Sequence, residues 1–458
     1  MLPILTFYSY LPGVIAIATD LRVSIQAVNL SLTFFLIVQG IAPIFWQPFI
    51  DTLGRRTVYM CSLIVYIVTT INLSLSWNYP MWLVSRGFQA AGVASLASIG
   101  CAVIQDIVPS ASRPRYVTIY QHVRNMTLFF SPIIGGLMTA SLDFRCVAIL
   151  LFALGLTYLT TILFFLPETL RAIAGNGTVP LKGIHVPIIH RLKFLTLLQH
   201  ESPLLSPRAT PRVSAPNFLR PLLLLREKDI VPNLLFPSIV YGIWIMVTVS
   251  TVPLFTTAFP NSFSPSTFSL LFLPNILGTI AGTSLIGNLL ASDFSTATTI
   301  YKDTNWLPSS IVISKLSLPS DFPLERTRLA RLPGLIILFI ISTSFYGFTL
   351  MYPSLTTLPG WPTIPLLLQF LIATTAHSIC GIHQTLVSDL WPLDAPAASV
   401  AANFVKGVFA GSGVAGIQWM VKVVEAGPAF LGLGFIVCMG VPLVVGEWVW
   451  GAAWRRER

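Results

Sequence analysis

Long apolar segments alternate with short polar ones along the chain. Each apolar segment is about 20 residues long, which is the length that an α-helix needs to cross the hydrocarbon core of a bilayer. Membrane-spanning strands would be only about 10 residues long, so the pattern predicts helices. We expect twelve of them, near residues 1–18, 27–50, 57–76, 80–106, 115–139, 144–166, 231–256, 264–291, 332–353, 362–388, 396–421 and 428–450.

The predicted helices form two groups of six, separated by a polar, proline-rich stretch. We expect an N-terminal six-helix bundle at residues 1–166, a cytoplasmic connector at 167–230, a C-terminal bundle at 231–450 and a cytoplasmic tail at 451–458. Within the connector we expect at most short helices, one of them amphipathic around residues 187–198 on the inner membrane surface. The chain opens on about 18 apolar residues, the lower limit for spanning a bilayer, so we expect a shortened first helix.

Composition agrees with a chain that crosses a membrane many times. Of the 458 residues 54% are hydrophobic and 10% are charged, with a mean hydropathy of +0.78, whereas a soluble domain carries about 25% charged residues. The formal charge of +10 raises the question of a nucleic-acid partner. The Lys and Arg residues lie mainly in alternate loops, which indicates membrane topology instead. We therefore expect no nucleic-acid partner, and we expect both termini in the cytoplasm.

The sequence gives no sign of an enzyme, a metal site or a disulfide framework. The five cysteines form no CxxC pair and no Cys-His spacing suited to a metal. The nucleotide-binding pattern G-x-x-x-x-G-K-[ST] and a catalytic triad spacing are also absent from the sequence. We expect no catalytic activity, no bound cofactor and no metal.

A short polar motif separates the second and third predicted helices. It contains Asp51, Gly54, Arg55 and Arg56. Asp51 can pair with either arginine and approach a helix N-terminus, which would hold a gate shut by about 1–3 kcal/mol. The alternative is that the two arginines serve only as anchors on the cytoplasmic side of the membrane.

An arginine and a glutamine lie inside the fourth predicted helix. Arg86 is about two turns from the helix start, where an unpaired guanidinium costs at least about 2.5 kcal/mol. We expect it to face protein or a wet cavity, with Gln89 on the same helix face. The alternative is that Arg86 extends to the outer interface of the membrane.

Two histidines of the tenth predicted helix are candidates for carrying a proton. None of the 17 acidic residues lies at mid-membrane in the predicted spans. His377 and His383 are therefore the deep titratable groups of the second half. The alternative is that both are hydrogen-bonded packing residues.

Two further cations lie inside predicted helices, Arg124 in the fifth and Lys406 in the eleventh. Polar groups at this depth are candidates for a substrate site, and cations favour acidic or neutral cargo over polyamines. The alternative is structural pairing with Asp106 or Asp389.

Four stretches match motifs that follow one another in one class of transporter. Residues 45–59 are similar to a loop motif G-x-L-x-D-R-x-G-R-R, and residues 86–92 to the start R-x-x-Q-G-x-G of helix 4. Residues 167–171 are close to a fungal signature P-E-T-L-R. An antiporter motif of helix 5, G-P-x-x-G-G, is matched in part by Ser131, Pro132, Gly135 and Gly136. Together they resemble the major facilitator superfamily, and within it the fungal twelve-helix drug:proton antiporters, a group with quinidine, polyamine and organic-acid exporters.

The resemblance implies an all-α polytopic membrane protein with two pseudo-symmetric six-helix bundles. It also implies an antiporter that uses the proton gradient to export a small organic molecule, such as a drug, toxin or secondary metabolite, by alternating access. It assigns Arg86 to proton coupling. A monomer in the plasma membrane is expected, with the vacuolar membrane as the alternative. A nutrient or organic-acid importer of the same fold and a transport-dead, receptor-like relative are the other functions that the sequence leaves open.

The second half carries a weaker version of the loop motif. Its equivalent loop spans residues 287–293 and has Ala291 where the acid would align. We therefore expect this loop to be degenerate.

Overall fold

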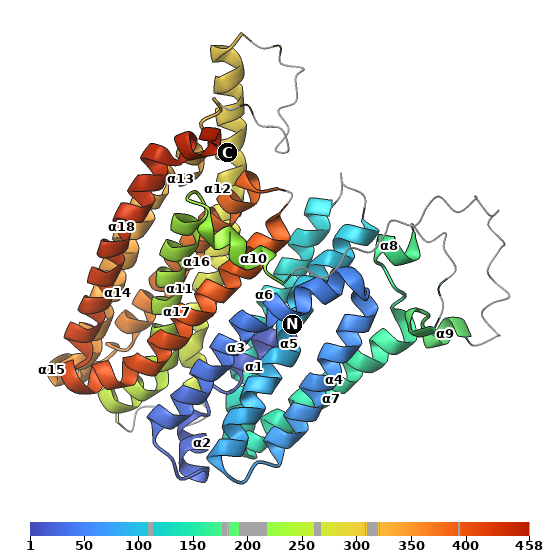
Figure 1. The fold of residues 1–458 in the computed structure, drawn as a ribbon. Coiled ribbons are helices and arrows are strands. Elements are labelled where there is room, and N and C mark those ends of the chain that lie inside the picture. The colour runs from blue at the N-terminus through green and yellow to red at the C-terminus, as the bar shows by residue number, and fades with distance from the viewer. Residues whose placement is uncertain are drawn as a thin grey trace. The chain divides into compact units, whose positions relative to one another are not determined.

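The computed structural model describes residues 1–108, 113–175, 181, 183–191, 218–260, 267–306, 308, 319, 321–392 and 394–457. All secondary structure in this part of the chain is helical (Figure 1). The chain divides into two compact units, unit 1 at Met1–Phe218 and unit 2 at Leu219–Arg458.

The described part of unit 1 holds ten helices, of which the last three have only three or four residues. They are α1 (Leu2–Tyr8), α2 (Val14–Asp20), α3 (Ile25–Thr52), α4 (Arg55–Ser74), α5 (Tyr79–Ile107), α6 (Arg113–Ser141), α7 (Phe144–Phe165), α8 (Arg171–Ala174), η1 (Gly183–His185) and α9 (Ile188–Arg191). Residues 188–191 are the described part of the amphipathic helix that was expected at 187–198. Most of the remainder lies outside the described residues.

The prediction of one continuous helix at residues 1–18 is wrong. Two helices of 7 residues each, α1 and α2, replace it. Residues 9–13 between them contain Pro12 and Gly13. Proline lacks a backbone donor and disfavours a helical conformation in the residue before it, and glycine has a low helix propensity. These two residues account for the break, which hydropathy alone does not register.

Side-chain caps fix the starts of two long helices in unit 1. Ser24 accepts a hydrogen bond through Oγ from the Ala27 backbone N–H at 3.2 Å, at the start of α3. Asn78 accepts one through Oδ1 from the Met81 N–H at 3.0 Å, at the start of α5. Each side chain satisfies a backbone donor that the first helical turn leaves free.

Unit 2 contains the remaining helices. They are α10 (Arg220–Leu223), η3 (Leu224–Arg226), α11 (Val231–Ala258), η4 (Thr267–Phe272), α12 (Leu273–Thr304), α13 (Leu324–Leu329), α14 (Leu332–Met351), α15 (Pro353–Thr356), α16 (Thr363–Leu390), α17 (Ala395–Val424) and α18 (Ala426–Glu457). Most of the long ones begin and end within a few residues of the predicted spans.

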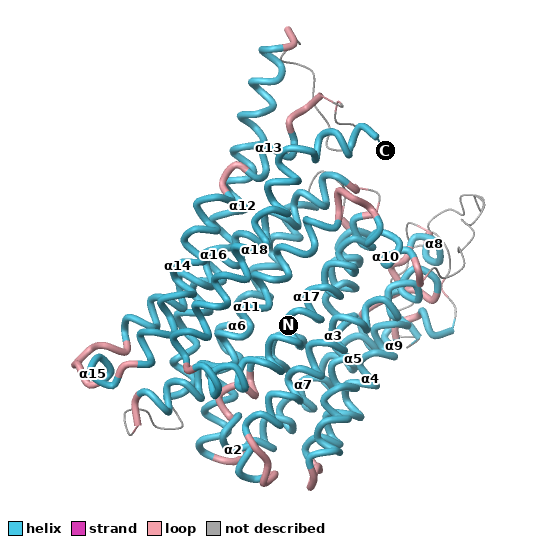
Figure 2. The backbone as a smooth tube through the Cα atoms, turned by 60° about the vertical axis from the view of Figure 1, so that its left-hand side comes forward, coloured by secondary structure: helices cyan, strands magenta, loops and turns pink. Residues whose placement is uncertain are grey.

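The helix α12 is longer than the sequence predicted. It continues to Thr304, beyond the expected end at residue 291, and projects past the other helices of its unit (Figures 1 and 2). Residues 292–304 are mostly polar, so hydropathy excludes them from a membrane span. They contain neither proline nor glycine, so nothing in their backbone chemistry ends the helix.

Ten helical segments in the described part are long and apolar enough to cross a membrane. The 29-residue α6 is not among them, since its first half carries polar residues such as His122 and Arg124. The prediction of an all-α polytopic membrane protein is confirmed.

Two glycines of α12 allow a close approach to α16 within unit 2. A Cβ added at Gly278 would lie 2.3 Å from the Phe370 carbonyl oxygen, and one at Gly282 would lie 2.3 Å from that of Thr374. Small residues at such crossings let helix backbones meet in membranes, where packing replaces the hydrophobic effect as the source of association.

Candidate functional site

Arg55 is the centre of an ionic cluster at one end of unit 1. Its Nη1 donates to Asp51 Oδ1 at 2.6 Å, and its Nε donates to Asp106 Oδ2 at 3.0 Å. Nη1 also donates to the backbone carbonyl of Ile50 at 3.1 Å. The guanidinium therefore ties the end of α3 to the end of α5 from its own position at the start of α4. Of the two arginines that could have paired with Asp51, the structure selects Arg55.

Glu168 caps the same end of α4. Its two carboxylate oxygens accept hydrogen bonds from the backbone N–H groups of Arg55, at 2.8 Å, and Arg56, at 3.2 Å. The carboxylate is 3% exposed and lies at the positive end of the helix dipole. Gly54 makes room for it, because a Cβ there would lie 2.3 Å from Oε2, and its φ of +97° also favours glycine. The sequence analysis noted Glu168 as part of a signature but did not predict this cap.

The side chain of Arg56 binds backbone carbonyls at the C-terminal end of α7. Its Nη1 donates to the carbonyl of Ile162 at 2.7 Å and to that of Leu166, and its Nη2 donates to that of Leu163 at 3.0 Å. These carbonyls lie in the last turn and at the C-cap of α7, and they form the negative end of its dipole. Arg56 is thus a buried helix cap and more than an exposed charge at the membrane surface.

Arg86 lies in the interior of unit 1 and is 0% exposed. Its Nη1 donates to Gln89 Oε1 at 2.8 Å and to the Thr6 carbonyl at 3.3 Å. The rings of Tyr10 and Phe35 flank the guanidinium, with their centroids 4.5 Å and 4.6 Å from its carbon. Arg86 therefore faces protein, and the alternative that it extends to the membrane interface is wrong.

One edge of the Arg86 guanidinium has no partner. Neither Nε nor Nη2 makes a hydrogen bond to any residue that the structure describes. The neighbouring hydroxyl of Tyr10, which is 2% exposed, also lacks a partner in the described part. Buried polar atoms are normally hydrogen-bonded, so an orphaned edge of a charged group indicates a place for a ligand.

The helix-5 motif on α6 holds the broken first helix. Ser131 Oγ donates to the Leu5 carbonyl at 3.1 Å. A Cβ on Gly135 would lie 2.0 Å from the carbonyl oxygen of Ser9, at the break between α1 and α2. Pro132, inside α6, and Gly136 are buried beside them. The small residues of this motif thus position the segment that carries Thr6 and Tyr10 against Arg86.

Unit 2 contains an arginine cluster that the sequence analysis missed. Arg328 in α13 donates to Asp389 Oδ2 through Nε at 3.0 Å and through Nη2 at 2.6 Å. Its Nη1 donates to the Leu290 carbonyl of α12 at 2.8 Å. The side chains of Arg328 and Asp389 are 2% and 5% exposed. The prediction of a degenerate loop concerned residues 287–293, where Ala291 leaves α12 without the first acid; the Arg328–Asp389 pair lies outside that stretch.

The predicted polar residues of unit 2 face one helix, α11. His383 Nδ1 lies 2.8 Å from Asn233 Oδ1, and the ring of His377 lies 4.4 Å from the centroid of the Trp244 ring. Lys406 Nζ lies 5.8 Å from the centroid of the Tyr241 ring. The structure thus gives each of the three a neighbour on α11.

Among the described residues, Arg124 and Lys406 do not pair with Asp106 or Asp389, the alternative partners named from the sequence. Asp106 pairs with Arg55 and Asp389 with Arg328. Arg124 is half-buried in unit 1, and its Nε makes no hydrogen bond within the described residues.

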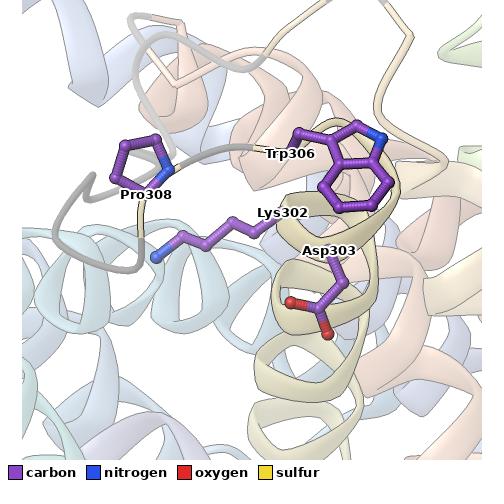
Figure 3. Close-up of a pocket in the computed structure, with 4 residues that line it drawn as sticks. All are labelled: Lys302, Asp303, Trp306 and Pro308. Carbon is purple, nitrogen blue, oxygen red and sulfur yellow. The ribbon is translucent and has the colours of Figure 1, made fainter.

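A surface pocket of about 400 Å³ lies at the far end of α12, lined by Lys302, Asp303, Trp306 and Pro308 (Figure 3). Lys302 extends toward Pro308, and the Asp303 carboxylate points away from the Trp306 ring. Trp306 is 92% exposed. None of these residues was predicted to bind substrate, and an exposed lining is unlike the concave, mostly apolar sites that hold small molecules.

Comparison with known proteins gives consistent matches. Residues 2–414 match the Major Facilitator Superfamily. The chain is 35% identical over 450 residues to Citrate exporter 1 of Aspergillus niger, covering 98% of this chain and 83% of that protein. It is 26% identical over 442 residues to MFS antiporter QDR2 of Candida albicans, covering 95% and 83% of the two chains. It is 26% identical over 450 residues to MFS-type transporter clz19 of Cochliobolus lunatus, covering 98% and 82%.

Proposed function

Because the chain belongs to the Major Facilitator Superfamily, whose members are transporters and generally not enzymes, we propose that it is a proton-driven exporter of a small organic acid. The observation that carries this proposal is the orphaned edge of Arg86. A substrate carboxylate is the ligand that this edge fits best.

The shape of the Arg86 guanidinium group favours a carboxylate. Nε and Nη2 lie on one edge, and their N–H groups point in parallel, as a carboxylate requires for two hydrogen bonds at once. Nη1 is already occupied by Gln89 and by the Thr6 carbonyl. The two flanking rings hold the plane of the group, so the free edge is fixed in direction.

The charge balance around Arg86 supports the same ligand. Its described contacts are an amide, a backbone carbonyl and two rings, and none of them is anionic. A buried cation without a counter-charge costs several kcal/mol. An acid substrate would supply that charge when it binds, whereas a cationic drug would add to the repulsion.

The relatives support export of a small acid without deciding it. The protein at 35% identity is named a citrate exporter, and QDR2 is named an antiporter. In the proposed cycle the Arg55 cluster closes the cytoplasmic end of unit 1, and its opening admits substrate from the cytoplasm. Export across the plasma membrane would follow, with the vacuolar membrane as the alternative location.

Transport into vesicles tests the proposal directly. We expect purified protein in proteoliposomes to move radiolabelled citrate or another small carboxylate in exchange for protons that move down an imposed gradient. Arg86→Lys keeps the charge but loses the pair of parallel N–H donors. A hydrogen bond to a charged group contributes about 1.5–3 kcal/mol, so we expect roughly 10- to 100-fold weaker transport. Arg86→Gln should remove transport.

A matched control comes from the same unit. Arg145 pairs with Asp20 at 2.9 Å and is half-exposed, so Arg145→Lys should leave carboxylate transport unchanged. Citrate transport by Arg86→Lys at the rate of the unmodified protein would contradict the proposal. So would transport by the unmodified protein of cationic compounds alone.

A further inference from the structure

The C-terminal half of α18 contributes to a buried group of charges in unit 2. Glu447 of α18 is 1% exposed, and Glu325 of α13 is 2% exposed. Arg455, two turns after Glu447, lies with its Nε 3.3 Å from Glu325 Oε1. Its Nη2 donates to the carbonyl of Phe322, just before α13, at 2.6 Å. Arg455 thus joins the end of α18 to the start of α13.

Glu447 and Glu325 lie side by side. A Cβ built on Gly451 would lie 3.0 Å from Glu325 Cγ and 3.2 Å from Glu447 Oε1, so both side chains reach the same glycine. Neither oxygen of Glu447 has a hydrogen-bond partner in the described part of the chain. Asp229, 4% exposed, also faces Glu447 and accepts a hydrogen bond from Trp391 Nε1 at 3.1 Å. Glu447 therefore lies near two other acids, Glu325, which pairs with Arg455, and Asp229, which binds the indole of Trp391.

This arrangement limits how many of the acids carry charge. A buried carboxylate without a cation or a donor is strongly unfavourable, and adjacent carboxylates commonly share a proton. Glu325 has Arg455, and Asp229 has the indole of Trp391. Glu447 has no cation beside it among the described residues, and its polar neighbour is the neutral Asn233 amide, so it is the acid that retains a proton.

We propose that Glu447 is a proton-binding residue of unit 2, and that its charge state controls the ion pair between Glu325 and Arg455. When Glu447 releases its proton to water, the new carboxylate competes with Glu325 for the one guanidinium. Reprotonation returns Arg455 to Glu325 and restores the link between α18 and α13. The use of this site in coupling rests on the proposed function, whereas the bound proton itself does not.

A polar link connects this site with the interior of the unit. The Asn233 amide lies alongside Glu447. Asn233 Nδ2 donates to the Asp229 carbonyl at 2.9 Å, which orients its Oδ1 to accept from His383 Nδ1, 2.8 Å away. His383 therefore carries its proton on Nδ1, and its Nε2 has no described partner. Other titratable residues on the helices packed against α18, such as Lys406 and Lys422 of α17, do not contact Glu447 in the described structure.

Infrared spectroscopy of the purified full-length protein tests the site without any substrate. A protonated carboxyl group gives a C=O stretching band that shifts in D₂O, and we expect Glu447→Gln to remove one such band. The control is Asp293→Asn, since Asp293 is half-buried on unit 2 and paired with Arg331 at 2.7 Å, and it should leave the band unchanged. Persistence of every band in Glu447→Gln would overturn the proposal.

Thermal unfolding gives a second, independent measurement. If Glu447 is neutral, glutamine replaces a neutral group of the same shape and the Tm should stay within about 2 °C. A large fall in Tm, or failure of Glu447→Gln to fold, would mean that the native carboxylate is charged and needed, which contradicts the proposal.

Proteoliposomes then separate this proposal from the proposed function. In the unmodified protein a proton gradient should accelerate citrate transport. In Glu447→Gln we expect the same rate with and without the gradient, so that the ratio of the two rates falls to about 1. An unchanged ratio would show that Glu447 is not the coupling site. If the unmodified protein moves no carboxylate but the infrared band is lost in the variant, the proposed function fails and the proton site stands.

Discussion

Each unit holds one arginine that ties three helices together, and the two arginines make the same kinds of contact. Arg55 donates through Nη1 to a backbone carbonyl of α3 and through Nε to Asp106 at the end of α5. Arg328 donates through Nη1 to a backbone carbonyl of α12 and through Nε to Asp389 at the end of α16. The two units therefore repeat one arrangement, although their loop sequences differ in length and composition.

The surroundings of the two ion pairs differ. The side chains of Arg55 and Asp106 are 11% and 14% exposed, and Arg55 has a second acid, Asp51, whose side chain is 58% exposed. Arg328 and Asp389 are 2% and 5% exposed, and no second carboxylate binds this arginine among the described residues. Arg328 thus depends on one buried carboxylate, whereas Arg55 binds two carboxylates and lies closer to solvent.

The charged groups at these helix ends also differ between the units. In unit 1 the acid Glu168 follows α7 and binds the start of α4. In unit 2 the acid Glu325 is part of α13, and the cation Arg455 comes from α18. The joint in unit 1 is therefore a carboxylate on backbone N–H groups, whereas the joint in unit 2 is an ion pair between two side chains.

Removing the carboxylate from each pair should have the largest and most unequal effect. Asp389→Asn leaves Arg328 buried without a counter-charge, which costs about 3–5 kcal/mol. Asp106→Asn leaves Arg55 with Asp51, so we expect a loss of about 1–2 kcal/mol. Tryptophan fluorescence during thermal unfolding of the purified variants measures both. Equal losses in the two variants would show that the second acid gives no protection.

Adding a methyl group at the first loop should have an intermediate effect. Gly54→Ala combines an unfavourable positive φ with a collision against Glu168, and we expect it to destabilise the protein by about 1–3 kcal/mol. Gly287, in the equivalent loop region of unit 2, lies in α12 with nothing within 4 Å of an added Cβ. Gly287→Ala should be neutral or stabilise by up to about 1 kcal/mol. A loss of stability in Gly287→Ala as large as that in Gly54→Ala would refute this distinction.

Neutralising the exposed acid should have the smallest effect on stability. Asp51→Asn removes a pair that is open to solvent, so we expect a change below about 1 kcal/mol. If Asp51 closes a gate, the carboxylate transport rate should change at a nearly constant Tm. Unaltered transport in this variant would favour the alternative that the loop charges serve only as anchors and caps.

Much of the fold could be predicted because the bilayer fixes both the length and the hydrophobicity of a spanning helix. α5 begins at Tyr79 and α16 at Thr363, each one residue from its expected start. The break at Pro12 and Gly13 and the polar end of α12 were not predicted, because hydropathy records neither backbone constraints nor helices in water.

The candidate site was less predictable because its contacts connect distant parts of the chain. Asp51 and Arg55 are four residues apart, on either side of the short turn between α3 and α4, so their pairing could be expected. Arg328 and Asp389 are separated by 61 residues, and Glu168 reaches across 113 residues to Arg55. Such contacts depend on which helix faces pack together, and that information is not contained in the apolar pattern of one sequence.

The contact of Gly278 and Gly282 with α16 determines how unit 2 can change shape. Two carbonyl oxygens of α16 lie where any larger residue of α12 would place its first side-chain atom. Sliding α12 by one helical turn would bring Pro274 or Ile286 to one of these positions, and each carries a Cβ. The close contact therefore fixes the position of α12 along α16. A change of shape that slides α12 along α16 would create steric overlap at these two carbonyls, whereas movement of the two helices together would not.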